Sequence, residues 1–216
     1  MKDKIIKRIK HSYLFRKLYG RIRKRGEIRI ENQGAAFRIV KRVRGTGNRV
    51  VIGEDSWIQK LQLIINGNGN EIIIEPSVRM GPGCSFLIEG NNCRVVIGRD
   101  THFTRLVHLC VQEDGMSINI GAGCMFANGV IIRTSDSHPI FDMEGRRINL
   151  PAPVVVGEKV WMAQQVIVMK GVNIGNGAIL GTRCVVTKDV PPNSLVVGVP
   201  GRVVKEGVYW THDHLF

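Results

Sequence analysis

The chain has 216 residues, enough for one domain with an appendage and for a sizeable buried core. Its 25 glycines and low aromatic content of 6% favour β-structure with many tight turns. No apolar stretch reaches the roughly 18 residues of a membrane span, and the charged N-terminus excludes the apolar core of a signal peptide. Five cysteines without C-x-x-C spacing argue against a disulfide framework, so we expect a cytoplasmic location.

Residues 1–26 are predicted to form a basic amphipathic helix. The net charge is +13, and residues 1–25 contain eleven Lys and Arg against the single acid Asp3. Such a helix binds an anionic surface at the inner membrane face or an acidic polymer; alternatively, it packs on its own or a neighbouring subunit with its charges in water. The sequence leaves both alternatives open. It contains no recognisable nucleic-acid-binding module, so we expect no nucleic-acid partner. The apolar positions at helical spacing are Ile5, Ile9, Leu14, Leu18 and Ile22.

Residues 27–203 contain internal repeats that predict a parallel β-helix. In the first half, four similar segments place Ile52, Ile74, Ile97 and Ile120 at spacings of 22, 23 and 23 residues. In the second half, a strict six-residue period runs through Val156, Met162, Val168, Ile174, Leu180 and Val186. A period of six does not fit a helix face; it fits a prism in which each hexad forms one short strand and one corner.

The position four residues after each inward aliphatic residue is predicted to lie near a corner where only small side chains fit. Cys84, Cys124 and Cys184 occupy this position, so we interpret them as packing residues rather than as reactive thiols.

The segment 134–153 interrupts the six-residue rhythm and is predicted to leave the prism as a loop. It contains SDSHPIFD, residues 135–142, with His138 near the start of the loop. Histidine titrates near neutral pH and can take a proton from a hydroxyl group, so His138 is a candidate general base. Asp136 could orient the imidazole, or it could only form an Asx-turn. Beyond the prism, residues 204–216 are predicted to form a short helical extension.

These features resemble the hexapeptide-repeat acyltransferases, in the branch of sugar and polysaccharide O-acetyltransferases. The resemblance covers residues 48–206 and is carried by SDSHPIFD and by VVVGEKVWMAQQVIVMKGVNIGNGAILGTRCVVTKDVPPNSLVVGVPGRVVK, residues 154–205. It implies a mainly β fold, a left-handed parallel β-helix, and an acetyl-CoA-dependent O-acetyltransferase. It also implies a homotrimer with active sites between subunits.

The resemblance assigns roles to individual residues. His138 corresponds to the base that takes the acceptor hydroxyl proton, and Trp161 to a side chain that contacts the acetyl carbonyl or seats the thioester. A structural role for Trp161, covering the core at a corner, is the alternative. The residues that match the acetyl-CoA site are Ala163, Gln164, Gly181 and Thr182 along the pantetheine arm, and Thr187, Lys188, Arg202 and Lys205 around the phosphates.

Branch members that act on small sugars have an asparagine in the coil before the catalytic loop, and residues 104–110 contain none. We therefore expect a capsular or other cell-surface polysaccharide, or its precursor, as the acceptor. The alternatives are an N-acetyltransferase of an amino sugar nucleotide, a zinc hydro-lyase of the γ-carbonic-anhydrase type, and a non-catalytic scaffold. The zinc site needs three histidines; His102 and His138 are available, but the third is missing, so we expect no metal. Otherwise His102 and His108 either line a neighbouring subunit's cleft or are exposed loop residues, and we favour exposed loop residues.

Overall fold

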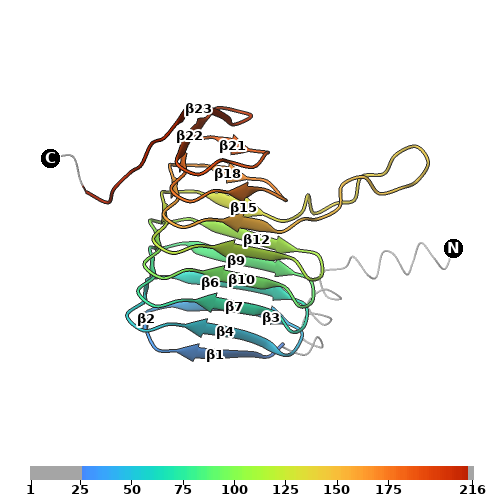
Figure 1. Cartoon of the computed structure of the whole chain (residues 1–216). Coiled ribbons are helices and arrows are strands. Elements are labelled where there is room, and N and C mark those ends of the chain that lie inside the picture. The colour runs from blue at the N-terminus through green and yellow to red at the C-terminus, as the bar shows by residue number, and fades with distance from the viewer. Residues whose placement is uncertain (1–25, 214–216) are drawn as a thin grey trace.

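A computed structural model describes residues 26–213, which form a β-solenoid with three flat faces (Figure 1). Successive strands along the chain belong to three different sheets, apart from the last two, which share one sheet and form the one antiparallel pair among the named strands of residues 26–213. The predicted parallel β-helix is therefore confirmed, while its left-handed winding stays a prediction. The expected N-terminal helix lies outside the described residues.

Each coil adds one strand to each sheet in the order A, B, C. Sheet A consists of β1 (Ile28–Asn32), β4 (Asn48–Ile52), β7 (Glu71–Ile74), β10 (Arg94–Ile97), β13 (Ser117–Ile120), β16 (Val154–Val156) and β19 (Asn173–Ile174). Sheet B consists of β2 (Ala35–Ala36), β5 (Trp57–Ile58), β8 (Arg79–Met80), β11 (His102–Phe103), β14 (Met125–Phe126), β17 (Trp161–Met162), β20 (Ile179–Leu180), β22 (Ser194–Val197) and β23 (Arg202–Glu206). Sheet C consists of β3 (Ile39–Arg44), β6 (Leu61–Asn66), β9 (Cys84–Glu89), β12 (His108–Gln112), β15 (Ile131–Arg133), β18 (Ile167–Val168) and β21 (Val185–Val186).

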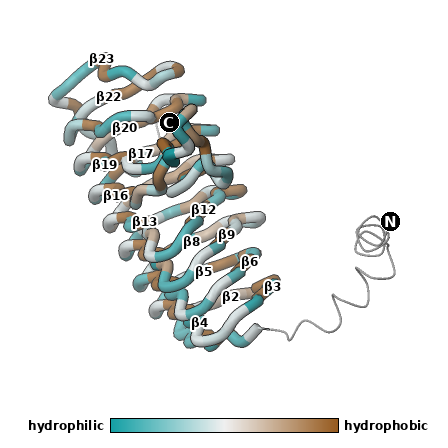
Figure 2. The backbone as a smooth tube through the Cα atoms, turned by 90° about the vertical axis from the view of Figure 1, so that its right-hand side faces the viewer, coloured by the Kyte–Doolittle hydropathy of each residue, from teal (hydrophilic) through white to brown (hydrophobic). Residues whose placement is uncertain are grey.

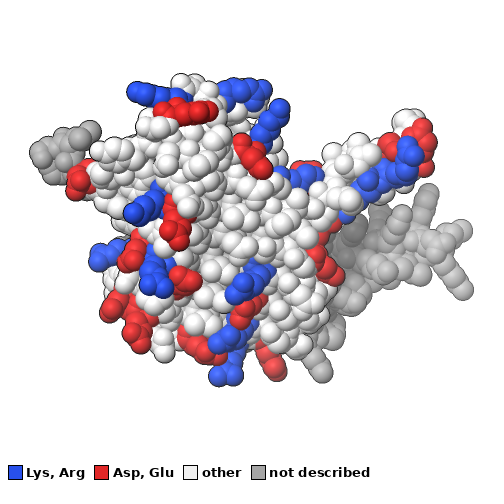
Figure 3. All heavy atoms as spheres, viewed as in Figure 1, with Lys and Arg blue, Asp and Glu red and all other residues white. Residues whose placement is uncertain are grey.

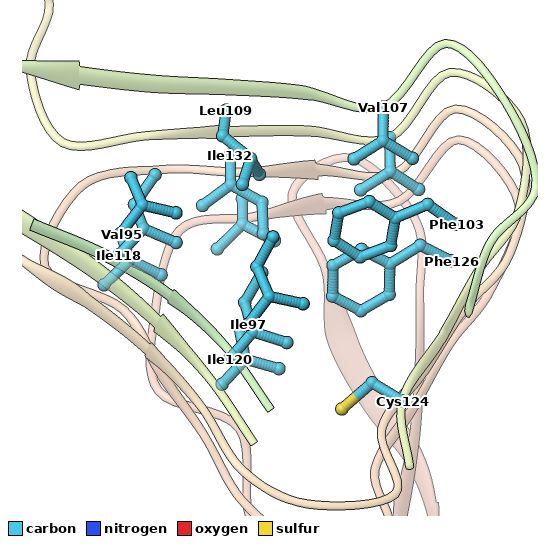
Figure 4. Close-up of a cluster of buried hydrophobic side chains, with 14 of the residues drawn as sticks. Val95, Ile97, Phe103, Val107, Leu109, Ile118, Ile120, Cys124, Phe126 and Ile132 are labelled. Carbon is cyan, nitrogen blue, oxygen red and sulfur yellow. The ribbon is translucent and has the colours of Figure 1, made fainter. Parts of the chain in front are cut away.

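The core is a set of columns in which the same inward position of successive coils stacks in register. Figure 4 shows Ile97 over Ile120 and Leu109 over Ile132, and the rings of Phe103 and Phe126 stack with centroids 4.9 Å apart. These side chains are almost fully buried. Their burial is the main force that holds the coils together, because a single coil cannot bury its own inner face.

The five cysteines are free and buried, which confirms the packing role predicted for three of them. Burial raises the pKa of the Cys84 thiol to about 11 and that of Cys124 to about 12. Both thiols are therefore neutral at physiological pH and lack the thiolate needed for nucleophilic chemistry.

Asparagine ladders account for the longer period of the first half. Buried Asn70 donates from its side chain to Asn48 Oδ1 at 3.0 Å, and its own Oδ1 accepts the Cys93 N–H at 2.8 Å. Gly67 packs so closely on the next coil that a Cβ there would lie 1.9 Å from the Gly90 oxygen. The four or five residues added to each 18-residue coil therefore extend the strands of sheet C and build turns that stack on one another.

The C-terminal segment differs from the prediction, because residues 204–213 contain no helix. Instead, β23 pairs antiparallel with β22, and residues 207–213 run back along the solenoid without regular structure. The pairing satisfies backbone groups that β22 would otherwise expose at the edge of sheet B.

Surface charges in the described part are mixed. On the face in Figure 3, acidic and basic side chains are interspersed rather than gathered by sign. On sheet A, Arg49 forms ion pairs with Glu31 and Glu71, both at 3.0 Å, and Arg94 pairs with Glu71. Across residues 26–213, no helix is both long and apolar enough to span a bilayer.

Candidate functional site

The loop between β15 and β16 leaves the solenoid at the corner between sheets C and A and projects away from it (Figure 1). Its outer part folds back as a hairpin, in which Ile148 N donates to Ile140 O at 2.9 Å and Asp142 N donates to Arg146 O at 3.0 Å. A positive φ of 81° at Gly145 allows the tight reversal. The loop is therefore an ordered arm with local hydrogen bonding of its own.

Asn149 ties the two strands at the base of this arm together. Its Nδ2 donates to His138 O and to Asp136 Oδ2, both at 2.9 Å, and its Oδ1 accepts the Ile140 N–H at 2.6 Å. The Asn149 side chain is thus satisfied although the residue is only 8% exposed. It fixes the backbone on which His138 is mounted.

Asp136 contacts different partners from those expected. Its carboxylate accepts hydrogen bonds from Lys170 Nζ at 2.6 Å and from Asn149, and these two bonds, in that order, lower its pKa. In the described part of the chain, no hydrogen bond joins Asp136 to the His138 imidazole. In the single chain Asp136 therefore supports the His138 backbone through Asn149, and a direct role of Asp136 in orienting the ring stays a prediction.

A second ion pair anchors the arm to the solenoid. Arg147 donates to both Glu113 oxygens, at 2.5 and 2.7 Å, and Ser135 Oγ donates to Glu113 Oε1 at 2.6 Å. The hydrogen bonds from Arg147 are the main reason that the pKa of Glu113 falls to about 2, and Ser135 adds to the shift. The arm is therefore held at its base by two carboxylates, one in the loop and one on the coil below.

His138 itself is exposed at the start of the arm. The preceding residue, Ser137, has a φ of 68°, and its N–H donates to Ser135 Oγ at 3.0 Å while its own Oγ donates to Gln112 Oε1 at 2.7 Å. A positive φ is unfavourable for a residue other than glycine, so Ser137 needs such local hydrogen bonds to keep this conformation. The backbone is thus fixed on both sides of His138, and the imidazole stays accessible to a substrate.

Trp161 lies in β17, just after the corner between sheets A and B, and packs against the C-terminal tail. Its ring centroid is 6.0 Å from that of Trp210, and Trp210 Nε1 donates to Lys159 O at 2.6 Å. The sequence analysis did not predict this contact, because it expected a helix at the C-terminus. In the structure, an irregular tail carries Trp210 back along sheet B.

One chain does not bring His138 and Trp161 together. The arm leaves from the corner between sheets C and A, whereas Trp161 follows the corner between A and B, so sheet A lies between them. In Figure 1 the arm and the C-terminal tail, which contacts Trp161, extend to opposite sides.

Most of the expected donor-site residues share one side of the solenoid. The Trp161–Ile179 register places Ala163 and Gln164 one coil below Gly181 and Thr182, at the corner after sheet B. Arg202 and Lys205 follow on β23, where they pair with Val197 and Leu195. Thr187 and Lys188 are exposed at the corner after sheet C instead.

His102 and His108 lie on strands, which corrects the expectation that they belong to loops. His102 is exposed on sheet B, whereas His108 is on sheet C with its Nδ1 2.6 Å from Ser85 Oγ. Burial is the main reason that the pKa of each is lowered. Among residues 26–213, no three His, Cys, Asp or Glu side chains form a group that could hold a metal ion.

Comparison with known proteins identifies the family. The chain is 34% identical over 125 residues to a polysialic acid O-acetyltransferase from Escherichia coli O1:K1 / APEC, covering 57% of this chain and 40% of that protein. It is 31% identical over 148 residues to the polysialic acid O-acetyltransferase of Neisseria meningitidis, covering 59% of this chain and 68% of that protein. The chain belongs to the hexapeptide-repeat acyltransferases.

Solved structures agree with this membership in the polysaccharide and sugar O-acetyltransferase branch. This acyltransferase matches the polysialic acid O-acetyltransferase OatWY with a TM-score of 0.75 and 30% identity, over 88% of this chain and 89% of that one. The polySia-specific acetyltransferase NeuO gives a TM-score of 0.58 and 28% identity over 88% and 91% of the two chains. No protein-family model matches the sequence.

Sequence reasoning missed every residue that anchors the arm except Asp136, whose partners it did not predict. The ion pairs Glu113–Arg147 and Asp136–Lys170 both bridge the insertion, and the six-residue pattern gives no register across an insertion. Asn149 offered a weak signal, since it is a polar residue directly before Leu150 and Pro151 at the point where the chain returns to the solenoid.

Proposed function

We propose that this hexapeptide-repeat acyltransferase transfers the acetyl group of acetyl-CoA to a hydroxyl group of a cell-surface polysaccharide or its precursor. The observation that carries the proposal is the accessible His138, mounted on an anchored arm of a solenoid whose relatives O-acetylate polysialic acid. The sequence matches span only 40% of the E. coli relative and 68% of the N. meningitidis relative.

His138 acts as the general base in this mechanism. Its imidazole takes the proton of the acceptor hydroxyl while the oxygen attacks the thioester carbonyl, a C–O bond forms, and the C–S bond breaks. The leaving thiolate of CoA then takes the proton back from the imidazolium. Trp161 contributes an indole N–H or a ring face to the bound acetyl group.

Asp136 is a positioning residue in this scheme. Its bonds to Lys170 and Asn149 hold the arm that carries His138, and the imidazole tautomer is left to be set by the substrate or by a neighbouring subunit.

The acetyl-CoA site fits the residues present on the C-terminal side of Trp161. Ile179, Leu195 and Lys205 follow Trp161 on successive strands of sheet B, so Lys205 is three strand spacings away, or about 14 Å. This row of positions suits an extended thioester arm that ends at phosphates held by Arg202 and Lys205. Ala163, Gln164, Gly181 and Thr182 flank it, and Thr187 and Lys188 lie at the corner that a neighbouring subunit would supply.

A homotrimer with its active sites between subunits accounts for the separation of His138 and Trp161. In a cyclic assembly, the arm of one subunit reaches the corner between sheets A and B of the next subunit. The exposed apolar side chains of the arm support such docking, since side chains of this kind are rarely left in water. They are Ile140, Phe141, Met143, Ile148 and Leu150. We place the reaction in the cytoplasm, and membrane contact through residues 1–25 remains a prediction outside the described residues.

Replacement of His138 by Ala tests the mechanism. We expect His138→Ala to abolish acetyl transfer to polysialic acid while its affinity for CoA, measured by calorimetry, stays unchanged. His108→Gln, a histidine on another sheet, is the matched control and should keep full activity. Unchanged turnover in His138→Ala would refute the assignment.

A further inference from the structure

The outward-facing positions of sheet B form one continuous column that passes through Trp161. In the strand register, Trp161 pairs with Met125, Met125 with His102, His102 with Arg79, and Arg79 with Trp57. The second residue of each of these strands is buried, so the first faces outward. Figure 2 shows β5 next to β8, with β17 further along the solenoid. We call the column from Trp161 to Trp57 the strip.

An exposed aromatic pair closes the N-terminal end of the strip. Trp57 is 40% exposed and Phe37 is 68% exposed, and their rings meet edge-to-face with centroids 5.7 Å apart. Four strand spacings separate Trp57 from Trp161, which places the pair about 19 Å from it. Two adjacent aromatic rings left in water are costly unless something covers them.

Two hollows lie beside the C-terminal tail, and one of them reaches the strip. A hollow of about 330 Å³ is lined by Ser77, Arg79, Asp100, Thr101, His102 and His212. A second hollow of about 460 Å³ shares Asp100 and His212 with the first and is also lined by Lys159 and Trp210. Asp100 and His212 line both hollows, so the tail borders a shallow groove that reaches Arg79 and His102.

The charge of the strip suits an acidic ligand. Arg79 takes part in no ion pair among residues 26–213, whereas all three arginines on the strands of sheet A are paired with Glu31 or Glu71. Burial and the nearby Arg79 and His212 hold the pKa of His102 below its usual value, so His102 is neutral at physiological pH and offers a hydrogen bond rather than a charge. Asp100 is the one acid in the hollow around Arg79.

We propose that the strip binds the acceptor chain itself, as an acidic polysaccharide whose sugar rings pack on the Phe37–Trp57 pair and whose carboxylates pair with Arg79. This inference rests on the proposed function and deepens it. The C-terminal half of the same column is assigned to acetyl-CoA, so the N-terminal half is the part of the column left for the acceptor. Sugar rings present C–H groups on their faces, which pack on aromatic rings, while their carboxylates and hydroxyls need polar partners.

The consequence is that the enzyme uses long chains better than short ones. Only an acceptor that extends about 19 Å from the reacting hydroxyl reaches the aromatic pair. We expect Trp57→Ala and Phe37→Ala each to raise KM for long polysialic acid about tenfold. The KM for a short sialic acid oligomer and that for acetyl-CoA should not change.

Arg79→Gln provides a test that does not depend on the aromatic packing, with Lys60→Gln as the matched control. Lys60 is an exposed cation just after β5, outside the strip. We expect Arg79→Gln to weaken long-polymer binding and to reduce its dependence on salt, and Lys60→Gln to leave both unchanged.

Direct binding of long polysialic acid, measured by calorimetry without acetyl-CoA, separates the strip from the chemistry. Loss of binding in Trp57→Ala supports the strip even if the transfer assay fails for every acceptor. Equal effects on long and short acceptors, or no effect on long ones, overturn the inference. A change of oligomeric state in Trp57→Ala or Phe37→Ala, seen by light scattering, also overturns it, because the pair would then be a contact between subunits.

Discussion

Asn149 offers a sharp test of how the arm positions His138. The perturbation is Asn149→Ala, which removes the side chain that joins His138 O, Asp136 and the Ile140 N–H at the base of the arm. These three hydrogen bonds are 2.9 Å or shorter. Each contributes a net ~1 kcal/mol, so the docked arrangement loses about 3 kcal/mol, which is about a hundredfold in the ratio of docked to undocked arms.

Because only the docked arm presents His138 correctly, we expect kcat to fall by about 10- to 100-fold. The arm lies outside the solenoid, so the melting temperature of Asn149→Ala should stay close to that of the unaltered protein. KM for acetyl-CoA should also be preserved. The assay is steady-state transfer to polysialic acid, with Tm measured on the same samples.

Arg146→Ala is the matched control, since Arg146 lies in the same arm but forms its ion pairs at the exposed tip, with Asp142 and Glu144. Exposed pairs of this kind contribute little, and kcat should not change. If Asn149→Ala kept kcat within about twofold of the unaltered enzyme, the reasoning that the anchored arm sets the position of His138 would be refuted.

Two further predictions concern the solenoid and the anchor of the arm. Asn70→Ala leaves the buried Cys93 N–H without its acceptor and should lower the free energy of unfolding, measured in urea, by about 1–3 kcal/mol. Asn68→Ala, on the exposed turn, should lower it by less. Equal losses would contradict a stabilising role for the buried asparagine ladder. The pKa of Glu113 is lowered from 4.5 to about 2, so its stabilisation of the docked arm is fully present above about pH 4.5 and is lost as the pH falls towards 2. Hydrogen-exchange protection of the Ile148 amide should therefore fall between about pH 4.5 and pH 2. Glu113→Gln should show weak protection already at about pH 5, and protection that does not change with pH in the unaltered protein would count against this anchor.

The solenoid was predictable because its packing is repeated in the sequence. Val156, Met162 and Val168 recur at six-residue spacing since each fills the same inward position on sheet A, B or C in turn, and the structure places all three in the core. The longer period around Asn48 and Asn70 was also informative, because its extra residues build stacked turns.

What the sequence did not predict depends on contacts across irregular segments. The partner of Asp136 is Lys170, and that pairing follows from how the arm returns to the solenoid rather than from any periodicity. In the same way, the segment after Pro200 pairs with an open sheet edge instead of forming a helix, and edge pairing is a tertiary effect. His138 could be predicted as a candidate base, but its separation from Trp161 became visible only once the corners of the prism were placed.

The most direct test of the proposed enzyme is complementation between two inactive variants. His138→Ala and Trp161→Ala subunits are unfolded together, mixed in equal amounts and refolded, and transfer of labelled acetyl groups from acetyl-CoA to polysialic acid is measured. If each site takes His138 from one subunit and Trp161 from the next, random mixing in a cyclic trimer restores both residues in about a quarter of the sites. We predict that activity returns to about that fraction, whereas either variant refolded alone stays inactive. A mixture of folded, assembled subunits that transferred no acetyl group would contradict a site shared between subunits.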